Sequence, residues 1–134
     1  MSLYVDSSAL LKRYVAEPES ARCDEILRTD PTWVTARHTW VEVLRNLARL
    51  LEGQDLVRLE KAFRADWRRM YVVELDRVTC ERAAELARSE RLRTLDALHL
   101  AAAYRMGGGA TPFLTYDVRQ AQAARALGMP VLGG

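Results

Sequence analysis

The chain has 134 residues, of which 49% are hydrophobic and 28% are charged, and its formal net charge is +2 at pH 7. This balance is typical of a globular protein and excludes intrinsic disorder, a collagen-like repeat and a coiled coil. No apolar run approaches the roughly 18 residues that a membrane span needs, and no basic stretch precedes Asp6, so we expect a cytoplasmic protein with a single domain over residues 1–134.

Hydrophobic periodicity predicts alternating strands and helices in the first half of the chain. Pro18 is typical of a helix start, and Gly53 is expected to stop the predicted helix at residues 37–51. We expect strands at residues 2–6 and 33–35, and helices at 7–15, 18–30, 37–51 and 56–70.

The second half continues the alternation. Thr79, Thr94 and Asp117 are expected to cap three helices, and the run from Gly107 to Gly109 is expected to stop the second of them as a flexible helix end. We expect strands at residues 71–75, 113–116 and 131–132, and helices at 79–89, 95–106 and 117–127. Five short strands separated by helices predict the α/β class, with a parallel sheet covered on both faces.

Four carboxylates are expected near the carboxyl ends of these strands, where open α/β sheets bind ligands. Asp6 and Asp117 directly follow predicted strands, and Glu42 and Asp96 lie near the starts of predicted helices. Each has a simpler interpretation, because aspartate often caps a helix and Glu42 could pair with a charged neighbour on its own helix. The candidate neighbours are His38, Arg45 and Arg49.

Taken together, the four carboxylates predict a metal site. Acidic side chains about 4 Å apart repel one another by several kcal/mol at an effective dielectric constant near 20, and a divalent cation removes that conflict. Donors that are all oxygen favour Mg²⁺ or Mn²⁺ over zinc. Such an ion activates water and stabilises the charge that develops on a phosphodiester.

Four motifs make the interpretation more specific. They read YVDSSAL at residues 4–10, WVEV at 40–43, RTLDALHLA at 93–101 and LTYD at 114–117. In order and spacing they resemble the PIN-domain ribonucleases, and more narrowly the VapC toxins of bacterial toxin-antitoxin pairs. The glycine-rich loop at 107–109 departs from the pattern, which would have a plainer turn there.

The resemblance implies a PIN-like, flavodoxin-like three-layer sandwich around a five-stranded parallel sheet. It also implies Mg²⁺- or Mn²⁺-dependent endoribonuclease activity on RNA, a homodimer and a cognate antitoxin. Residue by residue, it assigns the metal ligands and two hydroxyl groups that support them. The ligands are Asp6, Glu42, Asp96 and Asp117, and the hydroxyl groups are those of Ser8 and Thr115.

Two other functions compete with this interpretation. A receiver-like signalling domain shares the fold class, but it usually has a pair of acids after its first strand, where this chain has Asp6 alone. A non-catalytic RNA-binding module would not need four carboxylates.

Several other side chains are open to more than one interpretation. We expect His38 on a solvated helix face and His99 partly buried in a structural role, although His99 could face the site. We expect the three tryptophans to pack rather than to stack on bases. The predicted helices at 37–51 and 56–70 carry so many apolar residues that we expect exposed apolar surface and a homodimer.

The cysteines and arginines complete these expectations. The two cysteines, Cys23 and Cys80, are expected to be reduced and half-buried. Seven arginines could either form a rim that binds RNA or form salt bridges with glutamates. They are Arg45, Arg49, Arg68, Arg69, Arg88, Arg91 and Arg93.

Overall fold

A parallel sheet forms the middle of the protein in the computed structural model, which describes residues 2–134. Its strands are β1 (Leu3–Val5), β2 (Trp33–Ala36), β3 (Tyr71–Val73), β4 (Phe113–Leu114) and β5 (Val131–Leu132). Their order across the sheet is β3-β2-β1-β4-β5, and every neighbouring pair is parallel. The predicted α/β class and five-stranded parallel sheet are therefore confirmed.

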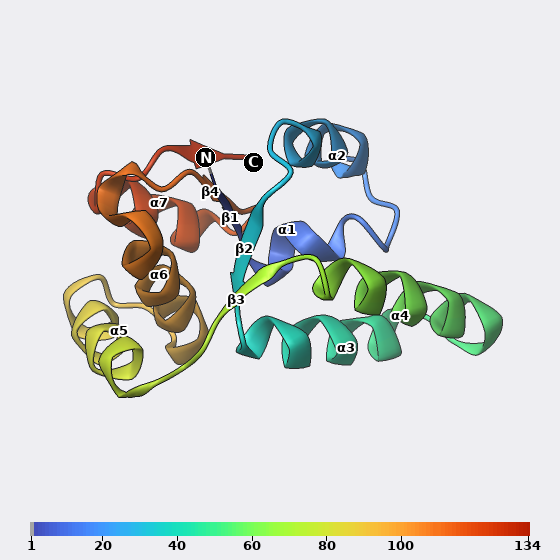
Figure 1. Cartoon of the computed structure of the whole chain (residues 1–134), viewed down its shortest axis with the longest axis horizontal. Coiled ribbons are helices and arrows are strands. Elements are labelled where there is room, and N and C mark those ends of the chain that lie inside the picture. Colours follow the sequence, from blue (N-terminus) through green and yellow to red (C-terminus); the bar gives the residue numbers. More distant parts are fainter. Residues whose placement is uncertain (1) are drawn as a thin grey trace.

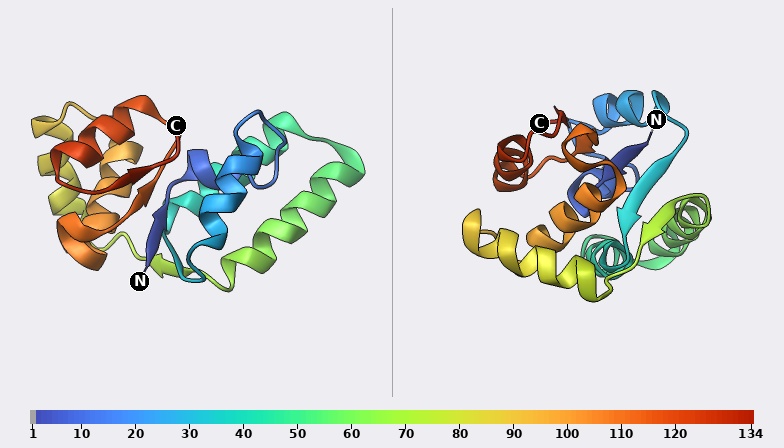
Figure 2. Two further views of the ribbon diagram at one scale, coloured as in Figure 1. Left: turned by 90° about the horizontal axis from the view of Figure 1, so that it is seen from above. Right: turned by 60° about the vertical axis from the view of Figure 1, so that its left-hand side comes forward.

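Helices cover both faces of the sheet, which gives three layers (Figures 1 and 2). One face carries α1 (Ser7–Leu11), α2 (Ser20–Arg28), α3 (His38–Leu50) and α4 (Gly53–Trp67). The other face carries α5 (Arg77–Ser89), α6 (Thr94–Gly107) and α7 (Val118–Ala126). A 3₁₀ turn, Gly108–Ala110, follows α6 where the sequence predicts a helix end.

The central position of β1 explains why Leu3, Tyr4 and Val5 are all hydrophobic. Side chains alternate between the two faces of a strand, and both faces are buried here. Leu3 and Val5 belong to the core beneath α1–α4, and Tyr4 belongs to the core beneath α5–α7. None of the three is more than 2% exposed.

The strand order places the chain's topological switch point between β1 and β4. The chain runs from β1 outward to β2 and β3, and β4 then returns to the other side of β1. The loops that follow β1 and β4 leave the sheet side by side, and this is where open α/β sheets form ligand sites.

Helix starts differ from the sequence prediction at two of three positions. Asp117 caps α7 as predicted, because its carboxylate accepts a hydrogen bond from the Gln120 amide at 2.9 Å. Asp76 replaces Thr79 as the cap of α5, and it accepts from the Thr79 amide at 3.0 Å. Thr94 is the first helical residue of α6 rather than its cap.

The first helix is shorter than predicted. It ends at Leu11, and the amides of Arg13 and Tyr14 donate to carbonyls only three residues earlier, at 3.1 and 3.0 Å. This tighter bonding closes turns instead of extending the α-helix. Gly53 likewise does not end α3; it begins α4, with a φ of 60°.

Helices α3 and α4 lie antiparallel and bury their apolar residues against each other (Figure 1). The Trp40 ring lies 5.5 Å from Phe63 and 5.3 Å from Trp67. The large hydrophobic residues left exposed on this pair are few: Val41, Leu50 and Val57. Exposed apolar surface on this pair is therefore confined to these three positions, since the two stripes otherwise largely cover each other, and the expected homodimer stays a prediction.

The tryptophans pack as predicted. Trp40 and Trp67 lie in the α3–α4 interface, and the Trp33 indole donates to the Leu27 and Asp30 carbonyls. Both cysteines are free thiols, but Cys23 is buried and Cys80 is exposed, so neither is half-buried. No helix within residues 2–134 combines the length and apolarity that crossing a membrane requires.

Candidate active site

Asp6 is a buried carboxylate that the fold holds in place. Its side chain is the N-cap of α1 and accepts hydrogen bonds from the Ala9 amide at 3.0 Å, from Ser8 Oγ at 2.7 Å and from Thr115 Oγ1. Burial raises the pKa of Asp6 above its ordinary value, and the His99 charge and these hydrogen bonds oppose that rise. The capping role and a position at the candidate site therefore coexist.

The two hydroxyl groups that support Asp6 also tie β1 to β4. Ser8 Oγ accepts from the Tyr116 amide at 3.0 Å, and Thr115 Oγ1 accepts from the Asp117 amide at 3.1 Å. Each hydroxyl can therefore use its own proton for Asp6. This network explains why the motifs around Asp6 and Asp117 occur together in one sequence.

Asp96 lies in the first turn of α6 and has a different environment. It is partly buried and forms no hydrogen bond or ion pair within residues 2–134. Burial raises the pKa of Asp96, and the charge of Asp117 raises it further, followed by the charges of Asp6 and Glu42. The structure therefore brings the four predicted carboxylates into one electrostatic neighbourhood.

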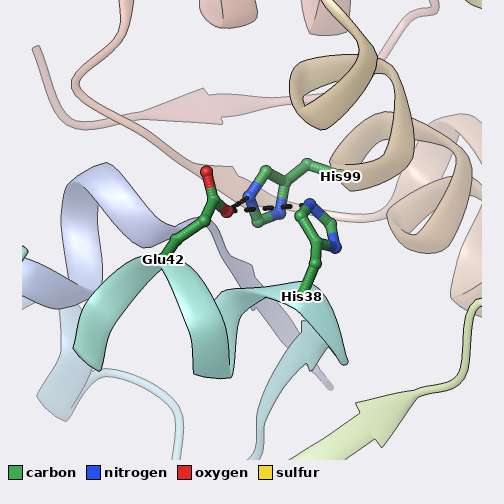
Figure 3. Close-up of side chains that lie close together, drawn as sticks. All are labelled: His38, Glu42 and His99. Atoms are coloured by element: carbon green, nitrogen blue, oxygen red, sulfur yellow. Dashed lines mark hydrogen bonds and ion pairs between the residues drawn. The ribbon is translucent and has the colours of Figure 1, made fainter. Parts of the chain in front are cut away.

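Glu42 approaches this neighbourhood from α3, and two imidazoles face it (Figure 3). Glu42 Oε1 lies 2.8 Å from His99 Nε2 and 3.7 Å from His38 Nε2. Burial acts to raise the pKa of Glu42, but the hydrogen bond and charge of His99 outweigh it and the pKa is lowered. Of the partners considered from sequence, only His38 lies beside Glu42.

His99 connects Glu42 to the core. Its Nδ1 lies 2.7 Å from the hydroxyl of Tyr4, which is fully buried on β1, and its Nε2 faces Glu42. If Tyr4 donates to Nδ1, the imidazole proton lies on Nε2 and points to Glu42. The two open interpretations of His99 are thus both realised, since it is a buried histidine that also contacts a site residue.

His38 is buried, and its predicted position on a solvated helix face is wrong. Its Nε2 donates to the Leu95 carbonyl at 3.0 Å, and its ring centroid lies 4.1 Å from that of His99. Burial and the neighbouring His99 lower the pKa of His38 to about 4. The sequence contains no signal for this pairing, because it depends on α6 packing beside the start of α3.

The four carboxylates suit a hard divalent cation. Their donor atoms are all oxygen, and no Lys or Arg within residues 2–134 forms an ion pair with any of them. They are less tightly grouped than the histidine cluster, since the set whose donor atoms all lie within 4.8 Å of one another is His38, Glu42 and His99.

None of the seven arginines considered from sequence forms an ion pair within residues 2–134, so the salt-bridge alternative for them is wrong. Arg91 and Arg119 line a surface hollow of about 420 Å³ between the segment that joins α5 to α6 and helix α7, and Glu90 lines it with them. Two arginines that form no ion pair within residues 2–134 therefore lie near the helices that carry Asp96 and Asp117.

Comparison with known proteins gives consistent matches over the whole chain. Residues 3–126 match the family model of the PIN domain. Ribonuclease VapC46 of Mycobacterium tuberculosis is 38% identical over 131 residues, which cover 98% of this chain and 96% of that protein.

Solved structures support the same fold. A toxin-antitoxin complex from Klebsiella pneumoniae contains a chain that superposes with a TM-score of 0.73 at 18% identity, covering 98% of this chain and 96% of its own. Mycobacterium tuberculosis VapC20, described as a toxin that cleaves the sarcin-ricin loop, also gives a TM-score of 0.73, at 19% identity, covering 90% of this chain and 94% of its own.

Proposed function

Because the chain belongs to the PIN-domain family, among its VapC ribonucleases, we propose that it is an Mg²⁺- or Mn²⁺-dependent endoribonuclease and the toxin of a toxin-antitoxin pair. Its candidate ligands are the carboxylates of Asp6, Glu42, Asp96 and Asp117. Ser8 and Thr115 support Asp6 without binding the ion themselves.

The environment of Asp96 carries this proposal. A carboxylate that has no hydrogen-bond donor and whose pKa is raised by burial and by three other carboxylates is unfavourable in the absence of a cation. A helix cap or a structural ion pair would have the opposite effect and lower the pKa. An arrangement that weakens the metal-free fold is understandable where a cation is a normal part of the site.

The residues of the proposed site have different roles. Ser8 and Thr115 orient Asp6, and His99 orients Glu42, so two of the candidate ligands are held in place by hydrogen bonds. Asp96 and Asp117 lie at the starts of two helices and face the same space. A divalent cation bound here supplies activation of water and stabilises charge on the phosphate.

The RNA backbone requires positive charge beside this acidic site. Arg91, Arg93 and Arg119 lie near the starts of α6 and α7 and have no acidic partner within residues 2–134. Arginine binds phosphate through two parallel hydrogen bonds. We infer that these side chains bind the phosphates that flank the cleaved bond.

The inferred partners are an antitoxin and a second copy of the chain, both in the cytoplasm. Several structurally similar proteins were solved as toxin-antitoxin complexes, which supports the antitoxin. Expression of the chain alone is expected to arrest bacterial growth, and co-expression with the antitoxin is expected to restore it. Equal growth with abundant, folded protein in both cases would contradict the toxin role.

The test of the activity is RNA cleavage with purified protein. We expect cleavage with Mg²⁺ or Mn²⁺, none with chelator, and a loss of about 100-fold or more in Asp6→Asn and Asp96→Asn, since the metal contributes several kcal/mol. Asp55→Asn is the matched control, because Asp55 is exposed on α4 and pairs only with Arg58. Cleavage that survives chelator or both active-site substitutions would overturn the assignment.

A further inference from the structure

The chain contains two histidines, and both lie in one buried cluster with Glu42. His38 and Glu42 are one turn apart on α3, and His99 reaches them from α6 on the opposite face of the sheet (Figure 3). The three donor atoms all lie within 4.8 Å of one another. Side chains far apart in sequence thus present two nitrogen donors and one oxygen donor to the same small space.

We propose that His38, Glu42 and His99 bind Zn²⁺ or a similar transition-metal ion, at a site that shares Glu42 with the four carboxylates. The proposed binding is independent of the ribonuclease function, because it rests on the positions of these three side chains. Its consequence, inhibition of RNA cleavage, rests on the proposed function.

The donor set distinguishes this ion from Mg²⁺. Imidazole nitrogen with one carboxylate is a typical zinc environment, whereas Mg²⁺ binds through oxygen. Metal-binding histidines usually hold their second ring nitrogen in a hydrogen bond, which fixes the direction of the ring. Tyr4 provides that contact for His99, with its hydroxyl 2.7 Å from Nδ1, once the His99 proton has moved from Nε2 to Nδ1 and the hydroxyl accepts it.

The separations need only a small adjustment. Zinc–nitrogen bonds of about 2.0–2.1 Å in a tetrahedral site bring two ligand atoms to roughly 3.4 Å from each other. Glu42 Oε1 now lies 2.8 Å from His99 Nε2 and 3.7 Å from His38 Nε2. An ion between them therefore requires Oε1 to move away from His99 Nε2 by roughly 0.6 Å and replaces the hydrogen bond that now joins these two atoms.

His38 sets the affinity of the site. Its Nε2 now donates to the Leu95 carbonyl, while its buried Nδ1 has no partner within residues 2–134. An ion at Nε2 requires the proton to move to Nδ1 and costs the hydrogen bond to Leu95. We therefore expect weaker binding than at a structural zinc site, with the fourth position left to water.

Occupation of the site changes what Glu42 can do. In the metal-free protein, Glu42 is held by His99 and faces the other carboxylates. With an ion on Oε1, the negative charge of Glu42 is neutralised and the carboxylate is drawn toward the histidines. The Mg²⁺ concentration for half-maximal cleavage is then expected to rise about 10-fold or more.

The binding test is calorimetric titration of Zn²⁺ into untagged, Mg²⁺-free protein. We expect one ion per chain in the wild type and at least about 10-fold weaker binding in His38→Gln, whose amide can still donate to Leu95. Cys80→Ser removes the exposed thiol, and Asp96→Asn removes a carboxylate outside the cluster; both are expected to keep the wild-type affinity. Loss of binding in Asp96→Asn with retention in His38→Gln would place zinc at the four carboxylates and overturn the proposal.

A second measurement needs no variant and covers the case in which His38→Gln does not fold. Nitrogen-15 NMR of the imidazoles gives signals from two residues only, and both are expected to shift on addition of one equivalent of Zn²⁺. Unchanged imidazole signals with zinc bound elsewhere would contradict the site.

Inhibition is measured as the RNA cleavage rate with and without Zn²⁺. The rate of each variant with zinc is compared with the rate of the same variant without zinc. We expect Zn²⁺ to inhibit the wild type and to inhibit His38→Gln at least about 10-fold less strongly. Zinc binding at both histidines without RNA cleavage under any condition would leave the site standing and refute the ribonuclease. RNA cleavage by a protein that does not bind zinc would refute the zinc site and leave the ribonuclease standing.

Discussion

Glu42 and Asp96 are carboxylates on two helices that face the same space, yet their surroundings are opposite. Glu42 lies between two imidazoles, and its pKa is lowered although burial acts to raise it. Asp96 has no hydrogen bond within residues 2–134, and its pKa is raised by burial and by other carboxylates. The contacts of Glu42 favour its charged form, whereas the surroundings of Asp96 disfavour its charged form.

This difference indicates how an acidic site can be ordered before a cation arrives and still bind that cation. Ligands that the protein already holds keep the geometry fixed before the cation arrives. A ligand without protein partners retains its full capacity to bind, and its repulsion from the other carboxylates is relieved only by positive charge. In the proposed cation site, Asp6 and Glu42 are therefore preorganised, and Asp96 is the carboxylate without a protein partner.

The largest expected effect compares the two residues through alanine substitution in metal-free protein at pH 7. Glu42→Ala is expected to cost about 2 kcal/mol in the free energy of unfolding, because it leaves the buried His99 Nε2 without a partner. Asp96→Ala is expected to leave that free energy unchanged or raise it. Urea unfolding measures both, and an equal loss in the two variants would remove the contrast.

Tyr4→Phe is expected to have a smaller effect on the free energy of unfolding, through the histidine that contacts Glu42. The substitution keeps the ring that stacks on Phe113 and removes only the hydroxyl that contacts His99. We expect a loss of about 1 kcal/mol in the free energy of unfolding. Tyr71→Phe is the control, because Tyr71 is 58% exposed. Equal stability of the Tyr4→Phe variant and the wild type would show that the tyrosine does not hold the imidazole.

The smallest effect is the pH dependence of Asp96. An acid whose pKa is raised by folding binds its proton more tightly in the folded state, so its contribution to stability falls as pH rises from about 4 through the raised pKa. We expect metal-free wild type to lose roughly a few tenths of a kcal/mol relative to Asp96→Asn between pH 4 and 7, since solvent screens this partly exposed group. Glu42 has the opposite sign, and its contribution is lost as pH falls through its lowered pKa. A difference between the two proteins that shrinks with rising pH would contradict the sign for Asp96.

Much of the fold and the acidic set could be predicted because both depend on local patterns. Apolar strands separated by helices predict a parallel sheet, and a carboxylate that directly follows a strand must lie at the sheet's carboxyl edge. Asp6 is of this kind, and Asp117 lies three residues after β4, which ends two residues earlier than predicted. The chemistry of the remaining two acids came from the motifs around Glu42 and Asp96, which carry the family resemblance.

The histidines could not be predicted because their environment is tertiary. The spacing of His38 and Glu42 places them on one side of α3, but it does not say whether that side meets solvent or another helix. His99 lies 57 residues after Glu42 and reaches it only because α6 packs near the start of α3. The extent to which the apolar stripes of α3 and α4 cover each other is tertiary for the same reason.

The central claim is that the four carboxylates form one cation site, and thermal unfolding of wild type and Asp96→Asn with and without Mg²⁺ tests it most directly. We expect Mg²⁺ at 100 times its dissociation constant to stabilise the wild type by about 2.7 kcal/mol, and to stabilise Asp96→Asn much less. Asp55→Asn is expected to respond as the wild type does. A loss of stability in Asp96→Asn that is the same with and without Mg²⁺ would reduce Asp96 to a favourable charge in the first turn of α6 and contradict the account.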